Sequence, residues 1–136
     1  MSEPSQIPTD PAATRSSIVV GYSSKAEGRA ALTRAVSEAH LRGSALIVVH
    51  TSADVELEDL RVELAATGVP HEIRAARDSL DPAEELLNAA EERQADFIVI
   101  GLRRRSPVGK LLLGSNAQRV LLDAACPVLA VKAEPS

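Results

Sequence analysis

Apolar residues recur along the chain in two alternating patterns, as short continuous runs and as longer stretches with a helical repeat. The runs consist mostly of branched aliphatic residues, which is typical of strands buried on both faces of a sheet. Between the runs, apolar residues return every three or four positions, which indicates helices with one buried face. The predicted strands are 18–20, 45–49, 69–75, 97–100 and 127–131. The predicted helices are 24–43, 54–67, one that begins at 81 and one that begins at 115.

This alternation predicts an α/β fold, a three-layer α/β/α arrangement around an open parallel sheet of five strands. The run from Phe97 to Ile100 is apolar on both faces, so we expect the fourth strand at the centre of the sheet. The third strand contains Pro70 and the polar pair His71-Glu72. A missing amide donor and polar side chains are tolerated at an edge, so the third strand is expected there.

The beginning of the chain differs from the rest. Residues 1–17 contain Pro4, Pro8 and Pro11 and few apolar residues, so we expect a disordered leader. The length of 136 residues fits a single domain, which we place at 18–133.

Composition and charge narrow the class of function. The chain is 45% hydrophobic but only 1% aromatic, and its formal net charge is −4. Few aromatic rings and a negative charge argue against a nucleic-acid partner. No apolar run approaches the roughly 20 residues that span a bilayer. We therefore expect a cytoplasmic protein that binds neither nucleic acid nor membrane.

The long segment from Gly101 to Ser115 carries the candidate chemistry. In an open parallel sheet, ligands bind beyond the carboxyl ends of the strands, and a long connection in a small domain is commonly functional. Gly101 is expected either to end the fourth strand in a turn or to let a ligand approach. Ser115 is predicted as the N-cap of a helix whose first amides favour an anion. The cations of the segment are Arg103, Arg104, Arg105 and Lys110.

No residue pattern indicates catalysis or a resident metal. The three histidines are scattered without the spacing of metal ligands. No histidine–acid pattern near Ser23 suggests that its hydroxyl group is an activated nucleophile. Ser24 and Glu27 form a capping-box pattern, in which the Glu27 carboxylate reaches back to the start of the first helix.

Four segments follow one another along the chain, in the order IVVGYSSKAEGRAAL, FIVIG, KLLLGS and CPVLAVK. Together they resemble the universal stress protein family. ATP-binding members of that family carry G-x2-G-x9-G-[ST] after the fourth strand. Gly101 matches the first glycine of this motif, and Gly114-Ser115 match its last pair. The resemblance extends from Ile18 to Lys132 and implies the strand order 3-2-1-4-5.

Two positions depart from the nucleotide-binding members. Arg104 stands where the motif has its second glycine, and Ser23 stands where those members place an acid that holds the ribose hydroxyls. A serine offers no bidentate charged acceptor, and a lost charge-assisted hydrogen bond is worth about 1.5–3 kcal/mol. Arg104 and its cationic neighbours could instead neutralise a triphosphate directly.

The resemblance implies an adenine nucleotide, ATP or AMP, as ligand, with Mg²⁺ only beside a triphosphate. Thr51 matches a position at which family members touch the adenine through the backbone. The predicted binding residues are Gly21, Tyr22, Ser23, Thr51, Ile100, Gly101, Arg103, Arg104, Gly114, Ser115 and Asn116. We expect no catalytic residue, and any ATP hydrolysis would be slow and incidental.

The last predicted strand bears on assembly. It is aliphatic on both faces, and an open edge there invites pairing with a second copy. The resemblance implies homodimers formed by antiparallel pairing of the two last strands. The predicted interface residues are Val128, Leu129, Ala130 and Val131.

Two functions therefore compete. The first is a regulatory stress protein that binds an adenine nucleotide. The second is a dimeric adaptor that binds no nucleotide and contacts an unidentified protein partner. A nucleotidyl-transfer enzyme is weaker than both, because no HxGH-type histidine pair follows the first strand.

Overall fold

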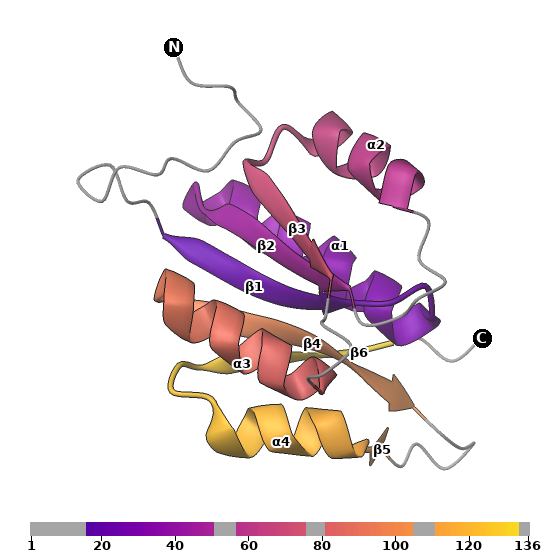
Figure 1. Cartoon of the computed structure of the whole chain (residues 1–136). Coiled ribbons are helices and arrows are strands. Elements are labelled where there is room, and N and C mark those ends of the chain that lie inside the picture. Colours follow the sequence, from indigo (N-terminus) through magenta and orange to yellow (C-terminus); the bar gives the residue numbers. More distant parts are fainter. Residues whose placement is uncertain (1–15, 51–56, 76–80, 105–110, 134–136) are drawn as a thin grey trace.

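The computed structural model describes residues 16–50, 57–75, 81–104 and 111–133. Strands and helices alternate along most of the chain (Figure 1). The strands are β1 (Ser17–Tyr22), β2 (Ala45–His50), β3 (His71–Ala75), β4 (Phe97–Arg104), β5 (Leu111–Leu112) and β6 (Val128–Lys132). The helices are α1 (Ala26–Arg42), α2 (Leu57–Thr67), α3 (Pro82–Arg93) and α4 (Ser115–Asp123).

All strands except β5 form one parallel sheet in the order β3-β2-β1-β4-β6. Since β6 is the fifth of the predicted strands, this is the order 3-2-1-4-5, and the α/β fold class is confirmed. β4 lies inside the sheet between β1 and β6, and β3 lies at an edge, as their residues predict. β5 is an additional short strand that pairs antiparallel with the end of β4.

Matching rows of side chains on the central strands build the core. Val20 lies in register with Val48 and Val99, and all three are fully buried on the face that α1 and α2 cover. The alternate row, which includes Val19, packs toward α3 and α4. Those two helices lie side by side in front of the sheet in Figure 1. Alternation along each strand therefore supplies both hydrophobic layers.

Helix α1 lies close to the sheet because its inner face is made of small residues. Gly28, Ala31, Ala35 and Ala39 recur at helical spacing and are buried. Along this row of small residues the helix backbone can approach β1 and β4 directly, whereas Leu32 is the long side chain among the buried residues of α1. This close approach determines the shape of the region at the carboxyl ends of those strands.

Several boundaries differ from prediction, among them the end of β4 and the start of β1. β4 does not end at Gly101 but continues to Arg104, because its ladder with β6 extends through Leu102. β1 begins at Ser17, inside the predicted leader, because Ser17 pairs with Ala45 of β2. The prediction for 1–15 lies outside the described residues. Within the described chain, no helix combines the length and apolar character needed to cross a membrane.

Candidate functional site

A cavity of about 390 Å³ lies at the carboxyl ends of β1 and β4. β1 leads to α1 on one face of the sheet, whereas the helix that follows β4 packs on the other face. Adjacent strands whose connections diverge in this way leave a crevice between them. Its lining residues are Gly21, Tyr22, Ser23, Lys25, Glu27, Gly28, Pro82, Leu86, Ile100, Gly101, Asn116, Ala117 and Val120.

A second hollow of about 500 Å³ adjoins this cavity near the start of α4. The two share Glu27, Gly101 and Ala117, so they meet at these residues. Its other lining residues are Leu102, Arg103, Leu113 and Gly114. Small-molecule sites commonly occupy about 300–1,000 Å³, so both hollows have the size of a binding site.

Most of the predicted nucleotide contacts lie around these hollows. Those in the first cavity are Gly21, Tyr22, Ser23, Ile100, Gly101 and Asn116. Arg103 and Gly114 line the second, whereas Ser115 lines neither. The Arg104 backbone belongs to β4, but its side chain and all of Thr51 lie outside the described part of the structure. Ligand contacts by these residues remain a prediction.

Gly101 is required by the packing of α1. A Cβ atom built on it would lie 1.9 Å from the carbonyl oxygen of Glu27 and 2.5 Å from its carbonyl carbon. Real Cβ atoms do not approach backbone so closely, so any side chain at this position would push α1 off the sheet. The prediction that Gly101 ends the strand in a turn is therefore wrong, since the residue lies inside β4.

Gly28 gives α1 a second close contact, with the turn that follows β1. A Cβ atom there would lie 2.3 Å from the Ser23 amide nitrogen and 2.4 Å from its Oγ. The same Oγ accepts a hydrogen bond of 3.4 Å from the backbone N–H of Lys25. Gly28 and Gly101 together hold the first turn of α1 against β1 and β4, and this fixes the position of Glu27.

Glu27 is an acid of the site that the sequence pattern assigned to helix capping. The N-cap of α1 is Lys25, not Ser24, and it makes no side-chain capping hydrogen bond. The capping-box prediction is therefore wrong. Glu27 instead lines both hollows, and its Oε1 lies 3.9 Å from Nε of Arg103 on β4. The sequence does show an acid in the first turn of the helix that follows the first strand. Local sequence alone, however, cannot tell whether such an acid lines a cavity or caps the helix.

The N-cap of helix α4 lies one residue earlier than predicted. Its N-cap is Gly114, and Ser115 is the first helical residue, so the prediction of Ser115 as N-cap is wrong. The side chain of Gln118 donates a hydrogen bond of 3.1 Å to the carbonyl oxygen of Leu113. Among the described residues, a Cβ atom on Gly114 would meet nothing within 4 Å. This open helix start provides amide N–H groups of the kind that favour an anion.

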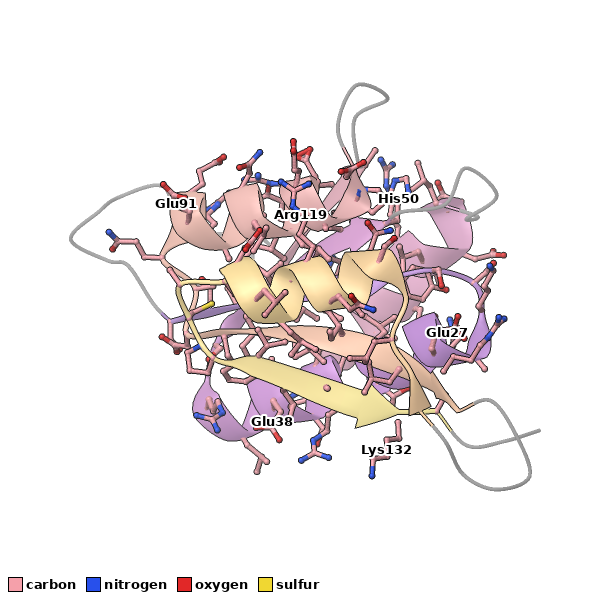
Figure 2. The ribbon with its side chains drawn as sticks, turned by 90° about the horizontal axis from the view of Figure 1, so that it is seen from below. Glu27, Glu38, His50, Glu91, Arg119 and Lys132 are labelled. Carbon is pink, nitrogen blue, oxygen red and sulfur yellow. The ribbon has the colours of Figure 1, made fainter. Side chains whose placement is uncertain are left out.

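Ion pairs hold α4 against the start of α3. Arg119 donates hydrogen bonds to Oδ2 of Asp81 at 2.9 Å and to Oε1 of Glu84 at 3.0 Å. Figure 2 shows Arg119 between the two helices. The hydrogen bond with Glu84, reinforced by the nearby carboxylates, raises the pKa of Arg119 above its ordinary value. Because these groups are partly exposed, they contribute more to the relative position of the helices than to stability.

Tyr22 is held at the other side of the cavity by a link between α1 and α2. Its Oη accepts a hydrogen bond of 3.0 Å from Nη1 of Arg29. The same guanidinium donates to both carboxylate oxygens of Glu63, at 3.0 and 3.1 Å. The hydrogen bond to Glu63 is the main cause that raises the pKa of Arg29 above its ordinary value, and the hydrogen bond to Tyr22 adds to it. Tyr22 therefore forms a buried and well-positioned wall of the cavity.

The described polar groups of the two hollows are suited to binding. The charged side chains among the lining residues are Lys25, Glu27 and Arg103, and these residues include no histidine or cysteine. Among the described residues, no group of three His, Cys, Asp or Glu side chains could hold a metal ion.

The chain is similar to known proteins over nearly its whole length. The model of the universal stress protein family matches residues 51–132. A universal stress protein of Mycolicibacterium smegmatis is 45% identical over 126 residues, which cover 85% of this chain and 96% of the relative. A solved universal stress protein of Archaeoglobus fulgidus is 33% identical with a TM-score of 0.66, covering 87% of this chain and 99% of the other. A universal stress protein from that organism in complex with dAMP is 27% identical with a TM-score of 0.62, covering 88% and 99%.

Proposed function

We propose, since the chain belongs to the universal stress protein family, that it is a cytoplasmic regulatory protein that binds an adenine nucleotide. The observation that carries the proposal is the convergence of most predicted contact positions on two adjoining hollows at the strand ends. Little or no catalysis is expected, because the described lining residues offer amides, hydroxyls and charges without a nucleophile beside a base.

The nucleoside would occupy the cavity beside β1, and its phosphates would extend toward α4. Gly21, Tyr22 and Ser23 would then contact the nucleoside. A backbone contact from Thr51 to the adenine is the expectation of the family resemblance. The phosphate end would meet Gly101 and the start of α4, where the residues we assign to this role are Arg103, Arg104, Gly114, Ser115 and Asn116. Ile100 would form part of the cavity floor, and Mg²⁺ would accompany only a triphosphate.

The solved relative in complex with dAMP supports an adenine nucleotide as the class of ligand. That protein is a universal stress protein that is 27% identical to this chain and matches it over nearly its full length. The open start of α4 supports the same ligand class, because a phosphate can approach the helix amides there without meeting a side chain at Gly114.

Isothermal titration calorimetry with AMP and with ATP, each with and without Mg²⁺, tests the proposal. Wild-type protein should bind at least one of them with a Kd on the order of micromolar. Gly114→Val should abolish binding, because its side chain would block the approach to the helix amides. The matched control is Asn88→Val on the exposed side of α3, which should leave binding unchanged. Absence of saturable binding at millimolar nucleotide would contradict the proposal.

The two departures from the family pattern can be reversed in one variant. Ser23→Asp with Arg104→Gly restores the acid and the glycine of the nucleotide-binding members. If wild-type protein binds, the double variant should bind at least as tightly. Binding that appears only in the double variant would mean that the natural protein has lost the site and would favour the adaptor function.

We also propose a homodimer formed through β6. β6 pairs with β4, and no strand among the described residues pairs with its other edge. The predicted interface residues are half-buried in the single chain: Val128, Leu129, Ala130 and Val131. Pairing of two such edges about a two-fold axis would join the two sheets into one.

Light scattering after size-exclusion chromatography tests the dimer and should give twice the mass of one chain. A monomer at about 100 μM would contradict the dimer, since this concentration exceeds the Kd of a stable interface.

A further inference from the structure

We infer that Glu27 sets the phosphate preference of the site. Its carboxylate weakens the binding of phosphates beyond the first and so lowers the affinity for a nucleoside triphosphate relative to the monophosphate. This inference rests on the proposed nucleotide binding and deepens it by naming the class of nucleotide. It concerns a residue that the sequence pattern assigned to helix capping.

The packing of α1 fixes where the carboxylate lies. The carbonyl oxygen of Glu27 sits directly over Gly101, and the next residue, Gly28, is packed against the backbone of Ser23. The first turn of α1 therefore cannot move away from the two strand ends without opening the core. The Glu27 side chain is 24% exposed, so it is neither free in solvent nor removed from the site.

Glu27 lies where the two hollows meet. It lines both the cavity beside Tyr22 and the hollow beside Gly114. The first cavity, of about 390 Å³, accommodates a nucleoside, and the hollow at the start of α4 receives what extends beyond it. A ligand that reaches from one to the other passes Glu27, which both hollows share with Gly101 and Ala117. A longer phosphate chain therefore places more negative charge near Glu27.

The charges around this junction oppose a long phosphate chain in two ways. The carboxylate repels phosphate oxygens, and a like charge placed at close range in a binding site reduces affinity. It also attracts Arg103, whose Nε lies 3.9 Å from Oε1 of Glu27 without a hydrogen bond. Part of the positive charge that would serve a phosphate is thus neutralised by the protein itself. Both effects increase with the charge of the ligand.

The experiment compares wild-type protein with Glu27→Gln and Glu91→Gln. Glutamine keeps the shape of the side chain and removes its charge. Glu91 is an exposed acid on α3 at the opposite end of the molecule from Glu27 (Figure 2), so its variant controls for net charge alone. The titrants are adenosine, AMP, ATP and inorganic tripolyphosphate, in buffer with EDTA and again with Mg²⁺. Urea unfolding verifies that each variant is folded.

In EDTA, Glu27→Gln should raise the affinity for ATP about tenfold and that for AMP about twofold. Affinity for adenosine should not change, because adenosine carries no phosphate. Tripolyphosphate should follow ATP, since it lacks the base and reports the anion site alone. Glu91→Gln should match the wild type with every titrant.

The outcomes separate this inference from the proposed function. If wild-type protein binds nucleotides and the ratio of ATP to AMP affinity is the same in Glu27→Gln, the inference is overturned and the function stands. If only Glu27→Gln binds ATP or tripolyphosphate, the inference stands and the function fails for the natural protein. If neither protein binds any titrant, both are overturned. A lower affinity of Glu27→Gln for ATP with Mg²⁺ would also overturn the inference, because the carboxylate would then be helping to hold the ion.

Discussion

The two ends of the glycine motif look alike in the sequence but differ in the structure. Gly101 lies within a central strand, and a Cβ atom there would collide with the backbone of α1. Gly114 lies at the start of α4, where a Cβ atom would meet no atom of the described residues within 4 Å. The first glycine is therefore required by the protein's own packing. The second is free of that requirement and serves as the N-cap of α4, a position at which glycine is common.

The surroundings of the two ends differ in the same way. The Gly101 end is held by steric contact between α1 and the sheet, and salt does not weaken such a contact by screening. The α4 end is held against α3 by the partly exposed ion pairs of Arg119. A motif read as one binding loop thus combines a structural end with an end available for binding. Substitutions at each end should separate stability from ligand affinity.

The largest expected effect is that of Gly101→Ala. The added methyl group would lie 1.9 Å from the Glu27 carbonyl oxygen, and neither backbone can yield without moving α1. We expect a loss of about 3 kcal/mol in the free energy of unfolding, at the upper end for overpacked cores. Urea denaturation followed by circular dichroism measures it. A loss below about 1 kcal/mol would show that α1 can shift at little cost.

A smaller loss is expected for Gly28→Ala. Alanine is favoured over glycine within a helix by about 1 kcal/mol, which acts in the opposite direction. The methyl group would nevertheless lie 2.3 Å from the Ser23 amide nitrogen, so the steric cost should prevail. We expect a net destabilisation of about 1–2 kcal/mol in the same urea assay. A variant more stable than wild type would mean that the turn after β1 yields freely.

Arg119→Gln should have a weaker effect that depends on salt. It removes the hydrogen bonds to Asp81 and Glu84 but leaves the packing of α4 through Val120 intact. The melting temperature should fall by a few degrees at most, and the difference from wild type should shrink at about 1 M NaCl. Differential scanning calorimetry at two salt concentrations measures this. A large, salt-independent loss would show that the α4 end is held by packing after all.

The smallest effect on stability is expected for Gly114→Ser. Serine is a preferred N-cap residue, and the backbone at this position has an ordinary φ of −66°. Stability should stay within about 0.5 kcal/mol of wild type. Affinity for the nucleotide should nevertheless fall, because the serine hydroxyl competes with a phosphate for the helix amides. An unchanged affinity, measured by calorimetry, would remove the proposed role of Gly114 in binding.

Much of the fold could be predicted because it follows from short-range patterns. Rows such as Val20, Val48 and Val99 appear in the sequence as separate aliphatic runs, and parallel pairing brings them together. The edge position of β3 follows from its polar residues. The extension of β4 to Arg104 was missed, because a glycine after an apolar run indicates a turn unless a neighbouring strand continues the ladder.

The position of the two hollows was predictable in outline, and their role as a binding site stays a prediction. The motif glycines and the ends of β1 and β4 lie around the two adjoining hollows, as their spacing indicated. Glu27 was not identified, because a capping box and a cavity-lining acid have the same local sequence. The two cases are distinguished by Gly101, which is distant in the sequence and allows the backbone of Glu27 to pack directly against β4.

The sequence by itself determined the alternation of strands and helices and the two hydrophobic layers, and it indicated the strand ends beside which the two hollows lie. These follow from side-chain periodicity, which depends on neighbours a few positions away. Only the tertiary structure decided which motif glycine is buried and where the Glu27 carboxylate lies. Both depend on the contact between the first turn of α1 and β4. The distance between this helix and the strand is set by small residues in segments that meet only after folding.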